Sequence, residues 1–145
     1  MRRDYSITPS MIGAQAGLIW VYNEPSVVTT FDEAHPLAIS GKKCNDSSFC
    51  LWYLSPVWTF ADPNNTQYAL LGEFNKWTAV SRQRFTSLTT NPERTTTIVG
   101  LVGGTIEIVE LLVYHSKLGI VRLNCSLSCA EGILQITLST VTCFS

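Results

Sequence analysis

Residues 51–88 read LWYLSPVWTFADPNNTQYALLGEFNKWTAVSRQRFTSL and decide the fold of the chain. Within them, residues 51–55 alternate between two sets of side chains, which predicts a strand whose two faces meet different surroundings. Residues 61–66, ADPNNT, are small or turn-forming and predict a loop. Residues 68–72 form a short apolar run that ends at a glycine, and residues 77–85 are predicted to form a third strand. The stretch therefore predicts three strands joined by two turns.

The same succession of apolar segments and turn residues continues on both sides of this stretch. A turn at Gly103-Gly104 is predicted to join two further strands in a hairpin. A helical period is absent, apart from one helical turn within residues 11–16. About ten short strands of this kind predict an all-β fold, an antiparallel two-sheet β-sandwich. The strands expected outside the central stretch cover residues 17–22, 27–31, 36–40, 94–102, 105–115, 117–126 and 133–144.

Length and composition predict a single β-sandwich domain over residues 1–145. A chain of 145 residues is near the modal size of a domain and can bury a full core. Residues 1–16 are expected to form an irregular N-terminal lead-in. The hydrophobic fraction of 46%, the charged fraction of 14% and the net charge of −1 are typical of neither a disordered chain nor a polyanion binder. We therefore expect no nucleic-acid partner.

No segment contains the ~18 consecutive apolar residues that a membrane-spanning helix needs. The nearest candidate, residues 97–114, is interrupted by Glu107, Glu110 and glycines. Residues 1–5 lack the apolar region of a signal peptide. The sequence thus predicts no membrane span, and the protein either stays inside the cell or is a mature or excised piece.

The chain contains five cysteines. Cys44 and Cys50 flank a polar loop, and a turn there would bring the two sulfurs within bonding distance, so we predict a disulfide between them. Cys125 and Cys129 are the other disulfide candidates, with Cys143 left over. A metal site is not expected, because no Cys-x2-Cys pair occurs and both histidines are far from either cysteine pair in sequence. No other cofactor is indicated.

Three N-x-[ST] sequons make Asn45, Asn64 and Asn124 glycosylation candidates. Two of them fall in the most loop-like segments, and one lies between Cys44 and Cys50. This combination favours an oxidising compartment, and therefore a lumenal or secreted protein. The alternative is a cytosolic protein with buried free thiols.

The sequence contains no arrangement that predicts an enzyme. The acids are spread over predicted turns and strand edges, and Glu107 and Glu110 are expected on opposite faces of a strand, so no carboxylate pair across a cleft is indicated. Glu73 is interpreted as a strand-end acid paired with Lys76 or Arg82. A nucleophile elbow and a glycine-rich phosphate loop are both absent. We expect no catalytic residue.

Aromatic rings and the polar groups near them are the remaining candidates for ligand or partner binding. Most rings in a sandwich of this size are expected to be buried. In particular, Trp52 and Leu54 are predicted to share one strand face, in the core, with Tyr53 on the other face. Arg82 and Arg84 are predicted on one face of a strand, and a solvated face is the simpler interpretation for them. The ligand or interface candidates are Trp52, Tyr53, Trp58, Trp77, Asn75, Arg82 and Arg84.

The order of several of these segments resembles a known family. The segments are Ile7-Thr8-Pro9, residues 18–22, the strand with Leu37 and Ile39, residues 51–57 and residues 68–72. Together they resemble the C-terminal β-sandwich of raffinose-synthase and α-galactosidase-like glycoside hydrolases, in which a strand ending in Pro-Val is followed by one ending in Leu-Gly. The resemblance is one of pattern and spans nearly the whole chain.

In that family the catalytic aspartates lie in a preceding (β/α)8 barrel, which this sequence does not resemble. The resemblance therefore implies no catalytic residue here. It implies a non-catalytic, carbohydrate-associated accessory module, whose partner is a catalytic domain or a larger protein assembly. The alternative is a structural or scaffolding subunit that uses the sandwich as a protein-interaction surface. The direction in which the aromatic rings face separates these two functions.

Overall fold

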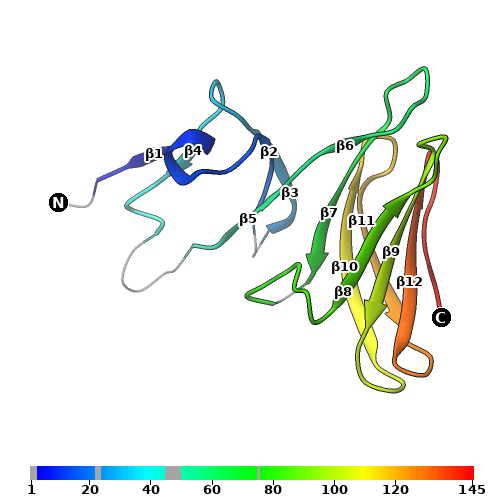
Figure 1. Cartoon of the computed structure of the whole chain (residues 1–145). Helices are drawn as coiled ribbons and strands as arrows, with labels where there is room; N and C mark the ends of the chain where they lie inside the picture. Colours follow the sequence, from blue (N-terminus) through cyan, green and yellow to red (C-terminus); the bar gives the residue numbers. More distant parts are fainter. Residues whose placement is uncertain (1–2, 22–23, 45–49, 75) are drawn as a thin grey trace. The chain divides into compact units, whose positions relative to one another are not determined.

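Strands dominate the chain in its computed structural model, which describes residues 3–21, 24–44, 50–74 and 76–145 (Figure 1). The only helical element in these ranges is one short 3-10 helix. Paired strands are antiparallel throughout the described ranges. The all-β, antiparallel fold class predicted from the sequence is confirmed.

Residues of the chain group into two compact units, residues 1–57 and residues 58–145. The single domain predicted over residues 1–145 stays a prediction, because two compact units can belong to one domain or to two. The boundary lies between the Pro56-Val57 pair and the segment that begins at Trp58.

The first unit contains a two-stranded and a three-stranded sheet, with strand orders β1-β4 and β3-β2-β5. The expected irregular lead-in is wrong for part of its length, because residues 5–7 pair with residues 37–39 as a strand and Pro9 starts a 3-10 turn. Proline suits the first helical position, where its missing N–H has no helical partner to lose. The elements are β1 (Tyr5–Ile7), η1 (Pro9–Ile12), β2 (Gly17–Val21), β3 (Glu24–Phe31), β4 (Leu37–Ile39) and β5 (Trp52–Ser55).

Trp20 is a large buried ring of this unit, and its neighbour on the sheet is Tyr53. Trp20 on β2 and Tyr53 on β5 are paired directly across the two strands, and their rings stack with centroids 5.0 Å apart. Trp20 is fully buried, whereas Leu54 is exposed and Trp52 is half-buried. Trp52 and Leu54 do alternate with Tyr53, as predicted. The prediction that both are buried in the core is wrong for Leu54, which is exposed. Ile19, the direct strand partner of Leu54, is buried, as is Trp20, the partner of Tyr53.

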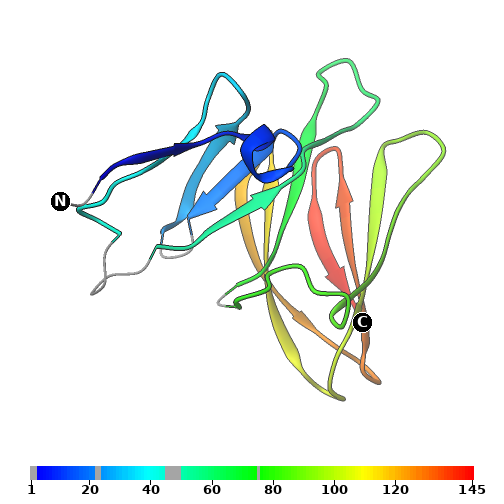
Figure 2. The ribbon, with the colours of Figure 1, turned by 60° about the vertical axis from the view of Figure 1, so that its left-hand side comes forward.

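The second unit is a β-sandwich of two four-stranded sheets, with strand orders β11-β10-β7-β6 and β13-β12-β9-β8 (Figures 1 and 2). Each sheet is built from two antiparallel hairpins, and successive hairpins along the chain alternate between the sheets. The strands are β6 (Trp58–Thr59), β7 (Gln67–Glu73), β8 (Phe85–Thr90), β9 (Thr96–Val102), β10 (Ile108–His115), β11 (Gly119–Ser126), β12 (Glu131–Thr137) and β13 (Val141–Phe144).

Three sequence predictions are corrected in this unit. The turn at Gly103-Gly104 makes no hairpin, because β9 and β10 belong to different sheets. The single strand predicted over residues 133–144 is two strands, β12 and β13, which pair with each other. Residues 77–84 form bends and turns, and the strand begins only at Phe85. The alternation of apolar and polar residues predicts a strand but not the sheet to which the strand belongs. The first two errors therefore concern how strands are connected, and only the third concerns whether a segment is a strand.

The core lies between the two sheets. Strand β9 buries alternate residues, Thr97, Val99 and Leu101, as a half-buried strand should. Val99 and Leu101 pack in one cluster with β10 and β12 side chains, including Leu111 and Leu134. The hydroxyl of Thr97 is buried in this core and forms a hydrogen bond with the hydroxyl of Tyr68 at 2.6 Å. Burial of polar groups with hydrogen-bond partners keeps their desolvation cost small.

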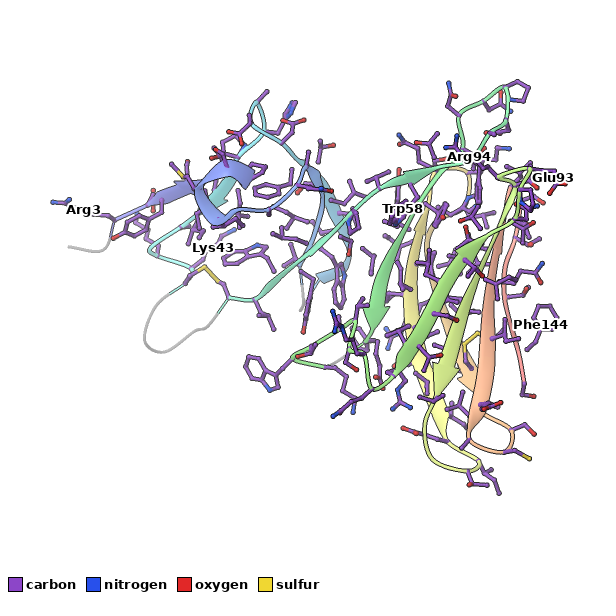
Figure 3. All side chains as sticks on the ribbon, viewed as in Figure 1. Arg3, Lys43, Trp58, Glu93, Arg94 and Phe144 are labelled. Atoms are coloured by element: carbon purple, nitrogen blue, oxygen red, sulfur yellow. A yellow bond between two sulfur atoms is a disulfide. The ribbon has the colours of Figure 1, made fainter. Side chains whose placement is uncertain are left out.

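Two disulfides are present among the described residues (Figure 3). Cys44 and Cys50 are bonded, as predicted, with Cα atoms 5.3 Å apart. Cys125 is bonded to Cys143, and Cys129 is a free, exposed thiol, so the Cys125 and Cys129 candidate pair is wrong. The short spacing favoured that pair, but Cys129 lies in the turn between β11 and β12 while Cys125 faces the core. The Cys125–Cys143 bond joins β11 to β13 and thus links the two sheets.

Candidate functional site

Arg84 is the centre of a charged cluster at one end of the sandwich. Its Nε and Nη2 donate to the carboxylate of Glu73, at 3.1 and 3.3 Å. Its Nη1 and Nη2 donate to the carboxylate of Glu107, both bonds being shorter than 3 Å, and Nη1 also donates to the Val102 carbonyl. The side chains of Arg84 and Glu73 are only 14% and 11% exposed. A planar guanidinium with five donors suits such a fork between two carboxylates.

The local backbone explains how these groups come together. Glu73 ends strand β7, and its N–H donates to the Ala79 carbonyl at 2.7 Å, so the segment that follows folds back over the strand end. Gly72 has a φ of 108° and no room for a Cβ, which would lie 2.4 Å from the Ala79 carbonyl oxygen. Only glycine accepts both conditions. Gly72 therefore marks a close approach of two backbone segments.

Gly103 plays the matching role on the other side of Arg84. A Cβ at Gly103 would lie 2.2 Å from Nη1 of Arg84 and 2.3 Å from Oε2 of Glu107. The Gly104 N–H donates to the same Glu107 carboxylate at 2.7 Å. The two glycines therefore allow the side chains of Arg84 and Glu107 to lie against the backbone. From the sequence, only a turn was predicted for this Gly-Gly pair.

Electrostatics fixes the charge state of the cluster. The hydrogen bonds from Arg84, together with the one from the Gly104 N–H, lower the pKa of Glu107 to about 2. The same carboxylates raise the pKa of Arg84 further above its usual value. A general acid near neutral pH needs a raised carboxyl pKa, so the shift of Glu107 is opposite to the one that acid catalysis requires.

A hollow of about 460 Å³ lies against this cluster. The indole of Trp77, 77% exposed, is part of its lining. Three neutral polar side chains, Thr78, Ser81 and Gln83, line it as well, together with Lys76 and the Arg84 cluster. An exposed flat ring beside groups that both donate and accept hydrogen bonds has the composition of a ligand site.

Of the sequence candidates, Trp77 and Arg84 line the hollow. Arg82 is exposed and does not line the hollow. Tyr53 packs on Trp20, and Trp52 is half-buried on the same strand. Asn75 lies outside the described residues.

Trp58 is separate from the hollow as well. It is 44% exposed on strand β6, which forms one edge of its sheet (Figure 3). Its neighbour Thr59 accepts a hydrogen bond from the Arg94 side chain at 3.1 Å. Trp58 therefore offers an exposed ring of the same chemistry as Trp77, away from the Arg84 cluster.

Several residues of the site were not predicted. Glu73 was interpreted as a structural acid paired with Lys76 or Arg82, whereas its carboxylate binds Arg84. Glu107 was given no role in a site, and Gln83 and Ser81 were assigned to a strand. The available signal was the coincidence of a glycine before Glu73 with a glycine pair before Glu107, because glycines next to charged residues often mark close packing of backbone against side chain.

The two histidines have structural partners. His115 is buried, with Nε2 2.8 Å from the Thr137 carbonyl and Nδ1 accepting the Lys117 N–H at 3.2 Å. These contacts assign the proton to Nε2. His35 bonds Asp32 at 2.8 Å in an exposed turn, and this hydrogen bond lowers the pKa of Asp32.

Among the described residues, no group of three or more His, Cys, Asp or Glu side chains is placed to hold a metal ion. No helix in the described ranges is long and apolar enough to cross a membrane. Of the glycosylation candidates, Asn64 and Asn124 are exposed, and Asn45 lies outside the described residues.

Comparison of the chain with models of protein families, with curated proteins and with solved structures finds no match. The resemblance to the C-terminal sandwich of raffinose-synthase-like hydrolases therefore stays a prediction.

Proposed function

We propose that this protein is a non-catalytic, carbohydrate-associated module, and that the hollow beside Trp77 holds the saccharide. The observation that carries the proposal is the Trp77 indole, 77% exposed in the lining of a hollow of about 460 Å³. Sugar rings present apolar C–H faces that stack on aromatic rings, while their hydroxyls need donors and acceptors around the rim. Thr78, Ser81 and Gln83 supply such groups.

The charges of the hollow favour a neutral sugar over an acidic one. Arg84 is saturated by Glu73, Glu107 and the Val102 carbonyl, so it has little capacity left to bind a carboxylate or sulfate on a ligand. The carboxylate of Glu107, whose pKa is lowered to about 2, would also repel an anion. A hydroxyl-rich neutral ligand avoids this repulsion and can still accept from Lys76 or donate to Glu107.

The absence of catalysis is part of the proposal. Hydrolysis of a glycosidic bond requires one carboxyl that is protonated near neutral pH and one that is ionised. Glu107 is held ionised by Arg84, and its pKa is lowered to about 2. The carboxylates are thus used to fix the position of Arg84 and of the segment that carries Trp77. As an accessory module, the protein would serve a catalytic domain or a larger assembly.

The disulfides support the proposed lumenal or secreted location, because such bonds persist mainly in oxidising compartments. Cys44–Cys50 and Cys125–Cys143 are both formed, one in each compact unit. Exposed Asn64 and Asn124 are accessible to glycosylation in that setting.

A scaffolding function is the alternative, and one observation favours it. Ile133 and Phe144 are direct partners of β12 and β13, and both are exposed on the outer face of their sheet. An exposed apolar pair on a sheet face suits a protein partner. In that case the hollow beside Trp77 would bind nothing.

A glycan array separates the two functions. The full chain is labelled and applied to the array as wild type, as Trp77→Ala and, as a matched control with another exposed ring, as Trp58→Ala. We expect the wild type and Trp58→Ala to bind the same neutral glycans, and Trp77→Ala to lose at least about tenfold in signal, because one stacked ring contributes about 1–3 kcal/mol. Absence of binding by the wild type, or equal binding by Trp77→Ala, would contradict the proposal.

A further inference from the structure

Two isoleucines are exposed at the end of the sandwich, Ile106 in the turn between β9 and β10 and Ile108 at the first position of β10. Ile106 is 86% exposed and Ile108 is 67% exposed. In both views this turn projects past the ends of the strands (Figures 1 and 2). Soluble domains expose single apolar residues often, but two large ones on a projecting turn are unusual and call for a physical reason.

The backbone of Ile106 adds a second observation. Its φ is 67°, in the left-handed region that a β-branched residue rarely adopts. Glycine or asparagine would occupy this position with less strain. Strain at an exposed residue contributes nothing to the core, so it indicates a function for the side chain that it presents.

The turn is held in place by hydrogen bonds, most of them to residues outside it. Glu107, between the two isoleucines, is fixed by the fork of Arg84 and by the Gly104 N–H. Its carbonyl accepts the Leu127 N–H at 2.8 Å, and the Gly103 N–H donates to Ala130 in the adjacent turn at 2.9 Å. The isoleucines are therefore presented on a preformed support, which lowers the entropic cost of binding.

We propose that this turn inserts Ile106 and Ile108 into the surface of a lipid bilayer. The shape favours lipid over protein, because isolated side chains on a projecting turn fit between acyl chains, whereas a protein partner needs a broader patch to bury. The charges permit close approach to headgroups. Arg84 offsets one of the two carboxylate charges of Glu73 and Glu107, and Lys76 in the lining of the same hollow offsets the other.

Vesicle flotation tests this inference with the full chain. The vesicles are of phosphatidylcholine alone and of phosphatidylcholine mixed with phosphatidylserine. The test variant is Ile106→Asn/Ile108→Gln, in which asparagine suits the left-handed backbone and no N-x-[ST] sequon is created. The matched control is Leu118→Ser, because Leu118 is 46% exposed in the turn at the other end of β10, roughly 24 Å away along the strand.

We expect the wild type and Leu118→Ser to float with vesicles, and the double variant to lose on the order of tenfold per isoleucine removed. Thermal melting shows that each variant is folded, and Ile106→Asn alone serves if the double variant does not fold. Failure of the wild type to float, equal flotation of the isoleucine variants, or self-association that depends on Ile106 would overturn the inference. The test does not involve Trp77, so its result is independent of the proposed carbohydrate site.

Discussion

Replacement of Arg84 by methionine tests how the end of the sandwich is held together. The change removes the guanidinium but keeps most of the apolar stem. Glu73, whose side chain is 11% exposed, then retains a carboxylate without its ion-pair partner. Breaking a buried ion pair by removing one member costs about 3–5 kcal/mol, mainly because the remaining charge stays desolvated. That is a large part of the ~5–15 kcal/mol by which a domain is stable.

The assay is urea unfolding of the full chain, followed by tryptophan fluorescence and fitted for the free energy of unfolding. Arg84→Met/Glu73→Gln should recover part of the loss, since it removes the charge left behind. Arg82→Met is the matched control, because Arg82 is exposed, and it should change the free energy by no more than about 0.5 kcal/mol. Exposed ion pairs contribute roughly 0–1 kcal/mol to the free energy of unfolding. If the free energy of unfolding of Arg84→Met differs from that of wild type by no more than this, the cluster does not hold the segment in place.

Two further changes test the same unit. Cys125→Ala/Cys143→Ala removes a disulfide that spans 18 residues and should lower the free energy of unfolding by about 3 kcal/mol. The control Cys129→Ala should leave the free energy of unfolding near the wild-type value, because Cys129 is a free thiol. A double variant as stable as wild type would show that the sheets are not joined by this bond. Because the pKa of Glu107 falls from 4.5 to about 2 on folding, its contribution is present above pH 4.5 and lost as the pH falls toward 2. The stability difference between wild type and Glu107→Gln should therefore shrink over that range in pH-dependent unfolding, and a difference independent of pH would refute the assignment.

The strand content was predictable from the sequence because alternation is a local property. Strand β9 was expected over 94–102 and is Thr96–Val102, and β2 was expected over 17–22 and is Gly17–Val21. The connections were less predictable, since a Gly-Gly turn can close a hairpin or carry the chain to the other sheet. Here Gly103 is needed for the approach of Arg84, which is 19 residues away in sequence and thus invisible to a local pattern.

The candidate site was predicted only in part. Trp77 and Arg84 were both identified as candidates, but on the assumption that residues 77–85 form a strand. The fold-back set by the hydrogen bond from Glu73 to Ala79 is a tertiary contact, and no residue type in that segment requires it. The same limit explains the cysteines, since Cys125 selects Cys143 through the packing of two sheets, not through short spacing.

The central claim is that a neutral saccharide binds on the indole of Trp77, and the indole N–H signals test it directly. The chain has four tryptophans, so a nitrogen-15 labelled sample gives four resolved indole signals, assigned by single substitution to phenylalanine. Galactose, raffinose and any glycan found on the array are added to the millimolar range. We predict that the Trp77 signal shifts and saturates while those of Trp20, Trp52 and Trp58 stay in place. Four unchanged signals, or a shift confined to Trp58, would contradict the account.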